Sequence, residues 1–332
     1  MLDRLAVRLS PSAPYPEARA LFKAAAAGDW AGCRGVVDVA EPQVRTRLIR
    51  LLGEHDRLGD LAVRAMDADP EDATAAATRA FQLIDQGWQV RGDGRARNVA
   101  NRKFEVFHRY LAEAEQVVHA GLTRSAYDTG LWTAGLTTSR GLQMGLDHAR
   151  YRYECLAAFD PHHVPGQSQL LQQLCPKWGG NWPEADEFAR TAMRAAPDGA
   201  HNAVLIVDYH LEKWLDQQRT KDLRSAPVRA DLEEAADRSV RHPAFRRTVG
   251  WVGVVNSFAM AFSLTGDRAA AKQMFAMLGP YASESPWVYQ SGDVPTVFRR
   301  SRARAYGLSG GLTGAADVLL VAAAPLIRYV TN

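Results

Sequence analysis

The chain has 332 residues, which is long enough for two average domains or for one elongated array of repeats. Its composition, 47% apolar and 23% charged, is that of a folded protein and excludes wholesale disorder. The formal net charge is only +3, which argues against a protein whose main partner is a nucleic acid.

The cysteines and the apolar stretches indicate in which cellular compartment the protein is located. Cys33, Cys155 and Cys175 are widely spaced and odd in number, which gives neither a disulfide framework nor a paired metal site. We therefore expect reduced thiols and a cytoplasmic protein. The first residues lack the apolar core of a secretory signal. The most apolar stretch, 315–327, is shorter than the roughly 20 residues that span a bilayer, so it predicts a terminal packing helix and no membrane partner.

Helical periodicity dominates the chain, and alternating runs of β-branched residues are scarce. Leu232, Ala236 and Val240, for example, share one face of a helix, while glutamate and arginine residues between them lie on other faces. The sequence therefore predicts an all-α protein. We divide it into four parts, which are N-terminal helix pairs (1–86), an Arg- and Gly-rich surface loop (87–103), central helix pairs (104–282), and an irregular segment with C-terminal capping helices (283–332).

A turn glycine is repeatedly followed by a proline, as expected where a tight turn precedes a helix and a stop follows it. Three such intervals have nearly the same length: 17 residues from Gly53 to Pro70, 16 from Gly145 to Pro161, and 17 from Gly180 to Pro197. With small residues after the glycines, this pattern resembles the tetratricopeptide repeat, a two-helix unit of about 34 residues. The resemblance implies antiparallel helix pairs stacked as an α-solenoid. A compact multi-helix bundle is the alternative.

A turn rich in tryptophan and glycine follows the second of these units. Residues 174–180 read Leu-Cys-Pro-Lys-Trp-Gly-Gly, which is similar to a short segment of uncharacterised bacterial helical-repeat proteins. That resemblance implies no activity. Trp178 and Trp182 could pave a binding surface to which Lys177 adds charge. In the other interpretation the glycines make a tight turn and the tryptophans fill gaps between repeats.

Two further groups of residues are candidates for ligand binding. Arg91 and Arg95 lie in the loop 87–103, where guanidinium groups and backbone amides suit a phosphate or a carboxylate. The loop lacks the spacings of known phosphate-binding motifs, which favours the other interpretation, a solvated surface loop. The second group lies on a predicted helix two elements after the tryptophan turn and could face it across a repeat. Its members are His201, Asn202, Asp208 and Tyr209.

Metal and covalent chemistry find little support in the sequence. No His-x-x-x-His or His-Glu-x-x-His pair is present, so we expect no metal and no cofactor. Residues 307–311 match Gly-x-Ser-x-Gly, but that motif requires a preceding strand, and helical sequence precedes it here. A glycine-rich link between terminal helices explains the match.

The leading functional hypothesis is a binding or scaffold protein. Stacked helix pairs form an extended inner face that could hold a peptide, a protein partner or a small molecule. The alternative is an enzyme of bacterial secondary metabolism with a metal-free acid–base pocket inside the helical array. A deep closed pocket would favour the enzyme, whereas an open apolar groove would favour the binding protein.

Overall fold

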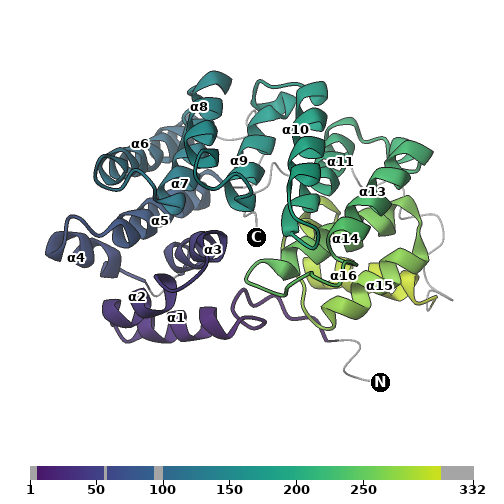
Figure 1. Ribbon diagram of the computed structural model, residues 1–332, viewed down its shortest axis with the longest axis horizontal. Coiled ribbons are helices and arrows are strands. Elements are labelled where there is room, and N and C mark those ends of the chain that lie inside the picture. Colours follow the sequence, from purple (N-terminus) through teal and green to yellow (C-terminus); the bar gives the residue numbers. More distant parts are fainter. Residues whose placement is uncertain (1–5, 56–57, 93–99, 308–332) are drawn as a thin grey trace. The chain divides into compact units, whose positions relative to one another are not determined.

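The computed structural model describes residues 6–55, 58–92 and 100–307. Over these residues the protein is all-helical, with one isolated parallel β-bridge, as the sequence predicts (Figure 1). The helices form two compact units. The N-terminal unit is Pro11–Asn181, and the C-terminal unit is Trp182–Asn332 together with Met1–Ser10. The boundary therefore lies inside the region 104–282, which the sequence-based division kept as one block.

The N-terminal unit is built from nine described α-helices and one short 3-10 turn. They are α1 (Pro16–Ala26), α2 (Trp30–Val37), α3 (Pro42–Gly53), α4 (Leu61–Ala68), α5 (Ala73–Arg91), α6 (Asn101–Arg124), α7 (Thr129–Gly141), α8 (Leu146–Ala157), α9 (Val164–Leu174) and η3 (Pro176–Trp178). Aspartate side chains begin three of these helices, because Asp29, Asp72 and Asp128 each accept a hydrogen bond from a backbone N–H three residues later.

The C-terminal unit contains the remaining described helices. They are α10 (Trp182–Ala195), η4 (His201–Ala203), α11 (Val204–Gln217), α12 (Thr220–Leu223), α13 (Ala226–Arg238), α14 (Trp251–Thr265), α15 (Arg268–Leu278), η5 (Trp287–Tyr289) and α16 (Val294–Ala305). Each interval between a turn glycine and a later proline contains one helix, α4, α8 or α10, so the pattern located these elements correctly.

Helix α3 occupies the interior of the N-terminal unit. The helices α5, α7 and α9 pack side by side, and α3 packs against all three of them. Its Leu48, Ile49 and Leu52 are fully buried, and the polar Thr46 and Arg47 are buried beside them. Helix α3 therefore lies against three helices at once, and its apolar side chains contribute to the core of the unit.

Helix α14 is the core of the C-terminal unit. It is apolar along almost its whole length, and α11, α13, α15 and α16 pack around it. The helix also contains the buried polar residue Asn256, whose side-chain oxygen accepts a hydrogen bond from the indole N–H of Trp287 at 2.6 Å. The N-terminal segment joins this unit, because the backbone of Arg8 pairs with Pro280 and Ala282.

The arginine-rich loop is shorter than the sequence predicts. Helix α5 continues to Arg91 and α6 begins at Asn101, so residues 87–91 and 101–103 are helical rather than part of a surface loop. Arg91 is buried, and its guanidinium lies 5.1 Å from the ring of Trp88 and 5.5 Å from that of Phe104. This cation–π packing places Arg91 at the contact between α5 and α6. Arg95 lies outside the described residues, as does Ser309 of the Gly-x-Ser-x-Gly match.

The crossing of α3 and α5 requires a glycine at position 53. A Cβ at Gly53 would lie 2.8 Å from the carbonyl oxygen of Thr78, whereas a Cβ at Gly35 of α2 would meet no heavy atom within 4 Å. We expect Gly53→Ala to lower the free energy of unfolding by about 2 kcal/mol, because backbone must move to relieve the clash. Gly35→Ala should raise it by about 0.5–1 kcal/mol through better helix propensity. Urea unfolding of both variants checks the pair, and equal effects would contradict this packing.

Candidate functional site

A groove of about 670 Å³ opens on the N-terminal unit between α2, α4 and the start of α5. We refer to it as the α2–α4 groove. Its walls are mostly small or apolar, and its polar groups are two arginines and three aspartates. The lining residues are Gly28, Trp30, Ala31, Arg34, Gly35, Asp38, Val39, Leu61, Arg64, Ala65, Ala68, Asp69 and Asp72. Val39 is 84% exposed, so an apolar side chain is available to a ligand at the rim of the groove.

Asp72 anchors the polar wall of the groove. One of its carboxylate oxygens accepts the backbone N–H of Ala75 at 2.9 Å and so caps α5. The other oxygen accepts the indole N–H of Trp30 at 2.8 Å and the Nη1 of Arg34 at 3.1 Å. The Nε of Arg34 also donates to Asp38 at 2.6 Å. Two aspartates thus fix one arginine, and with it the position of α2 relative to α5.

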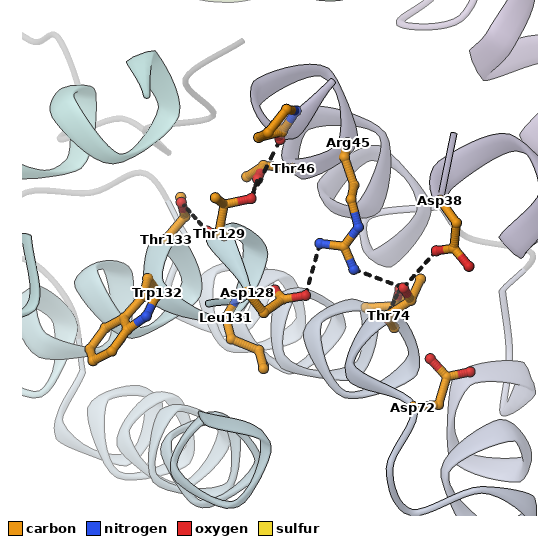
Figure 2. Close-up of polar contacts among 12 residues, drawn as sticks. Asp38, Arg45, Thr46, Asp72, Thr74, Asp128, Thr129, Leu131, Trp132 and Thr133 are labelled. Carbon is orange, nitrogen blue, oxygen red and sulfur yellow. Dashed lines mark hydrogen bonds and ion pairs between the residues drawn. The ribbon is translucent and has the colours of Figure 1, made fainter. Parts of the chain in front are cut away.

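A chain of polar contacts continues from the groove into the unit. Figure 2 shows Arg45 of α3 reaching between Asp128 and Thr74, at 2.8 Å from each. The hydroxyl of Thr74 donates in turn to Asp38 at 3.1 Å. Asp128 also caps α7 through the backbone N–H of Leu131. The wall of the groove is therefore held by the same contacts that join α3, α5 and α7, which gives it a fixed shape.

His163 ends this polar system as a neutral helix cap. Its Nδ1 accepts the backbone N–H of Gly166 at 3.2 Å, so the ring proton lies on Nε2, which is 3.1 Å from the hydroxyl of Thr46. Burial, together with the positive charge of Arg47, lowers the pKa of His163 to about 3. His163 therefore serves as the cap of α9.

The tryptophan turn is held by a few specific contacts. In η3 the ring of Trp178 lies under the guanidinium of Arg140 at 5.6 Å, and its carbonyl accepts the side-chain amide of Gln173 at 2.7 Å. Gly179 has a left-handed φ of 91°, and a Cβ at Gly180 would lie 2.2 Å from the carbonyl oxygen of Leu174. These contacts give the two glycines and Trp178 structural roles, while Lys177 is exposed.

The other predicted ligand residues lie in the C-terminal unit, and the structure brings part of them together. The rings of Trp182 and Tyr209 meet edge to face at 6.0 Å, and Lys213 donates to the hydroxyl of Tyr209 at 3.1 Å. His201 and Asn202 are buried in η4, where the Nε2 of His201 lies 3.0 Å from the carbonyl of Arg246. Lys177 and Trp178 belong to the N-terminal unit.

Asp208 belongs to a buried carboxyl pair on α11. Glu212 lies one turn later, is 1% exposed, and accepts the hydroxyl of Tyr289 at 2.9 Å. Burial raises the pKa of Asp208 to about 7, the negative charge of Glu212 adds to the increase, and a hydrogen bond from Ser257 opposes it. The Asp208 residue as a whole is half-buried, whereas its carboxyl group lies in the interior, where burial acts on its pKa. It is a candidate general acid or base.

A second carboxylate of this unit serves the structure. Asp231 of α13 accepts two hydrogen bonds from Arg190 of α10, both 2.6 Å long, and its Oδ2 lies 2.9 Å from the Nε2 of His210. Burial by itself would raise the pKa of Asp231, but the bonds from His210 and Arg190 outweigh it and hold that pKa well below its usual range. This cluster therefore joins three helices.

Reactive thiols and metal ligands are not prominent in the described part of the chain. Burial, with the charge of Asp29, raises the pKa of Cys33 to about 11, which makes this thiol a poor nucleophile. The described residues contain no group of three or more His, Cys, Asp or Glu side chains placed to hold a metal ion. None of the described helices combines the length and apolarity that crossing a bilayer requires.

Sequence reasoning missed the α2–α4 groove. The signal that could have suggested part of it is the spacing of Asp29, Asp72 and Asp128, each of which precedes a helix by one residue. That signal predicts helix starts, but it does not predict that Trp30 and Arg34 converge on Asp72 across 42 and 38 residues of sequence.

Comparison with known proteins finds no relative of this chain. No family model matches the chain, and neither a curated protein nor a solved structure matches it. The class of the protein is therefore defined by its own fold, an all-α protein of packed helix pairs.

The neutral cap at His163 makes stability depend on pH. The unfolded chain takes up a proton at this residue near its ordinary pKa of about 6.5, whereas the folded chain does so only near pH 3. Stability should therefore fall with decreasing pH below about 6.5, by up to about 1.4 kcal/mol per pH unit from this group. We expect His163→Asn, which can still cap α9, to show a shallower loss. Urea unfolding between pH 7 and pH 4 measures the slopes, and the exposed His119→Asn serves as the control. Equal slopes in the two variants would contradict the assignment.

Proposed function

We propose that this protein is a binding module that holds a segment of a peptide or of a protein partner in the α2–α4 groove. The groove itself is the observation that carries the proposal. Its apolar floor offers area to bury, and its polar wall is fixed in place by Asp72, so that little ordering is required on binding. We further propose a cytoplasmic location, in keeping with the three widely spaced cysteines.

The small side chains of the groove support a peptide more than a compact metabolite. Gly28, Ala31, Gly35, Ala65 and Ala68 line it and leave the backbone accessible along two helices. An elongated ligand can lie against such a surface, and the groove is open rather than enclosed. In the same unit α3 packs over α5, α7 and α9. We therefore assign binding to the α2–α4 groove and not to an inner face of stacked helices.

A steric block tests this function. A Cβ at Gly35 meets no heavy atom within 4 Å, so a larger side chain there enters the groove without moving the backbone. We expect short peptides selected from a random library on the wild-type protein to bind Gly35→Leu at least about tenfold more weakly. Gly35→Ala, which adds only one methyl group, should retain binding. Fluorescence polarisation measures the affinities, and far-UV circular dichroism confirms that each variant is folded.

Two results would contradict the groove as the binding surface. One is a selection that yields no specific peptide. The other is a set of selected peptides that bind Gly35→Leu as tightly as they bind the wild type.

The carboxyl pair of α11 favours a second function, acid–base catalysis on a small metabolite without a metal. A carboxyl group whose pKa is about 7 can both donate and accept a proton near neutral pH. Asp208 would be that group, while Tyr289 holds Glu212 in place through its hydroxyl. This candidate rests on one proton-exchanging group, whereas the groove offers both a cavity and a fixed polar wall.

The protonation of Asp208 can be measured directly. We expect a side-chain carboxyl carbon signal in ¹³C NMR that titrates near pH 7 and disappears in Asp208→Asn. Because the pKa is raised on folding, this group stabilises the protein below about pH 4, and that contribution is lost as the pH rises through about 7. Asp208→Asn should therefore lose less stability than the wild type between pH 4 and pH 8 in urea unfolding. A carboxyl that titrates near pH 4 would remove the catalytic candidate.

A further inference from the structure

The charges around the α2–α4 groove are unequal. Its lining contains Arg34 and Arg64 against Asp38, Asp69 and Asp72, and Asp60 lies beside Arg64 as its ion-pair partner. Both arginines are thus already engaged by carboxylates of the same protein. Negative charge remains in excess on the surface that a ligand would meet.

Arg34 is neutralised within the wall of the groove. It donates from Nε to Asp38 and from Nη1 to Asp72, at 2.6 and 3.1 Å. The hydrogen bond with Asp38 is the largest of the effects that raise the pKa of Arg34 above its ordinary value. Two carboxylates around one guanidinium leave a local surplus of negative charge. An anionic ligand would have to displace one of them.

Asp69 adds a more accessible carboxylate at the end of α4. It is exposed, and one of its oxygens accepts the backbone N–H of Glu71 at 3.0 Å, which fixes the side chain over the turn between α4 and α5. Among the described residues no basic side chain forms an ion pair with Asp69. A cation supplied by a ligand therefore meets a carboxylate that is held in place and lies on the lining of the groove.

We propose that the ligand of the α2–α4 groove is a basic peptide segment, which sets a lysine or arginine beside Asp69 and lays small or aliphatic side chains against Ala31, Gly35 and Ala65. This inference rests on the proposed binding function and specifies the chemistry of the partner. The apolar floor supplies burial, while the carboxylates supply the preference for positive charge. Because Asp69 is exposed, its effect on affinity is modest and depends on salt.

Peptide selection with a charge-altered variant tests the inference. Short random peptides displayed on phage are selected on the wild type and on Asp69→Lys, and the selected sequences are compared. We expect lysine and arginine to be enriched on the wild type and this enrichment to fall on Asp69→Lys. Peptides from the wild-type selection should bind Asp69→Asn about two- to fivefold more weakly, the size of an exposed ion pair. The amide oxygen that Asp69→Asn introduces can still accept the backbone N–H of Glu71, so the turn is retained.

A matched control and a salt series complete the test. Glu105→Gln removes one exposed carboxylate from α6, outside the groove, and should leave the affinity unchanged. Raising sodium chloride from about 50 to about 500 mM should weaken wild-type binding about two- to fivefold, and Asp69→Asn binding by less. Affinities are measured by fluorescence polarisation.

The outcomes separate the inference from the function on which it rests. Selected peptides that are blocked by Gly35→Leu but are neutral or acidic would overturn the basic ligand and leave groove binding intact. Equal effects of Asp69→Asn and Glu105→Gln would also overturn it. Failure to select any peptide, or peptides insensitive to Gly35→Leu, would contradict groove binding itself.

Discussion

The hydrogen bonds to Asp72 are the contacts on which the candidate binding surface depends. One carboxylate caps α5 and at the same time receives Trp30 and Arg34 from α2. A buried carboxylate is costly unless it is hydrogen-bonded. The partners of Asp72 come from two helices, Trp30 and Arg34 from α2 and Ala75 from α5, so the burial of Asp72 requires that α2 and α5 keep their positions. The groove forms because α2 is held in this position, where its residues line the groove together with those of α4 and the start of α5.

The same principle extends through the N-terminal unit. Asp128 caps α7 and receives Arg45 of α3, while His163 caps α9 and lies beside Thr46 of the same helix as Arg45. Polar side chains of α3 therefore meet the capping groups of the helices it packs against. This explains how a helix with a buried threonine can occupy the interior of the unit. The groove that we propose as the binding surface lies elsewhere in the unit, beside α2 and α4.

The core of the C-terminal unit is an apolar helix, in contrast to the polar helix α3 of the N-terminal unit. The apolar helix α14 supplies the core, and the ionisable residues of α11 are divided between two environments. His210 is paired with Asp231 and Arg190 in a cluster that holds helices together. Asp208 has no such cation among the causes that set its pKa, and burial keeps its proton near neutral pH. Two residues along α11 thus separate the structural charge cluster at His210 from Asp208, a group with the protonation behaviour of an acid–base residue.

The sequence by itself determined the all-α class, because helical periodicity is a local property, and it located α4, α8 and α10 through their flanking glycines and prolines. Tertiary structure alone decided the length of α5, where Arg91 is stabilised by aromatic rings of α6 that a local pattern does not reveal. It alone decided the groove as well. Trp30, Arg34 and Asp72 have ordinary positions at or within their own helices. The tertiary fold brings the side chains of Trp30 and Arg34 within hydrogen-bonding distance of Asp72, and this contact belongs to the wall of the groove that we propose as a binding surface.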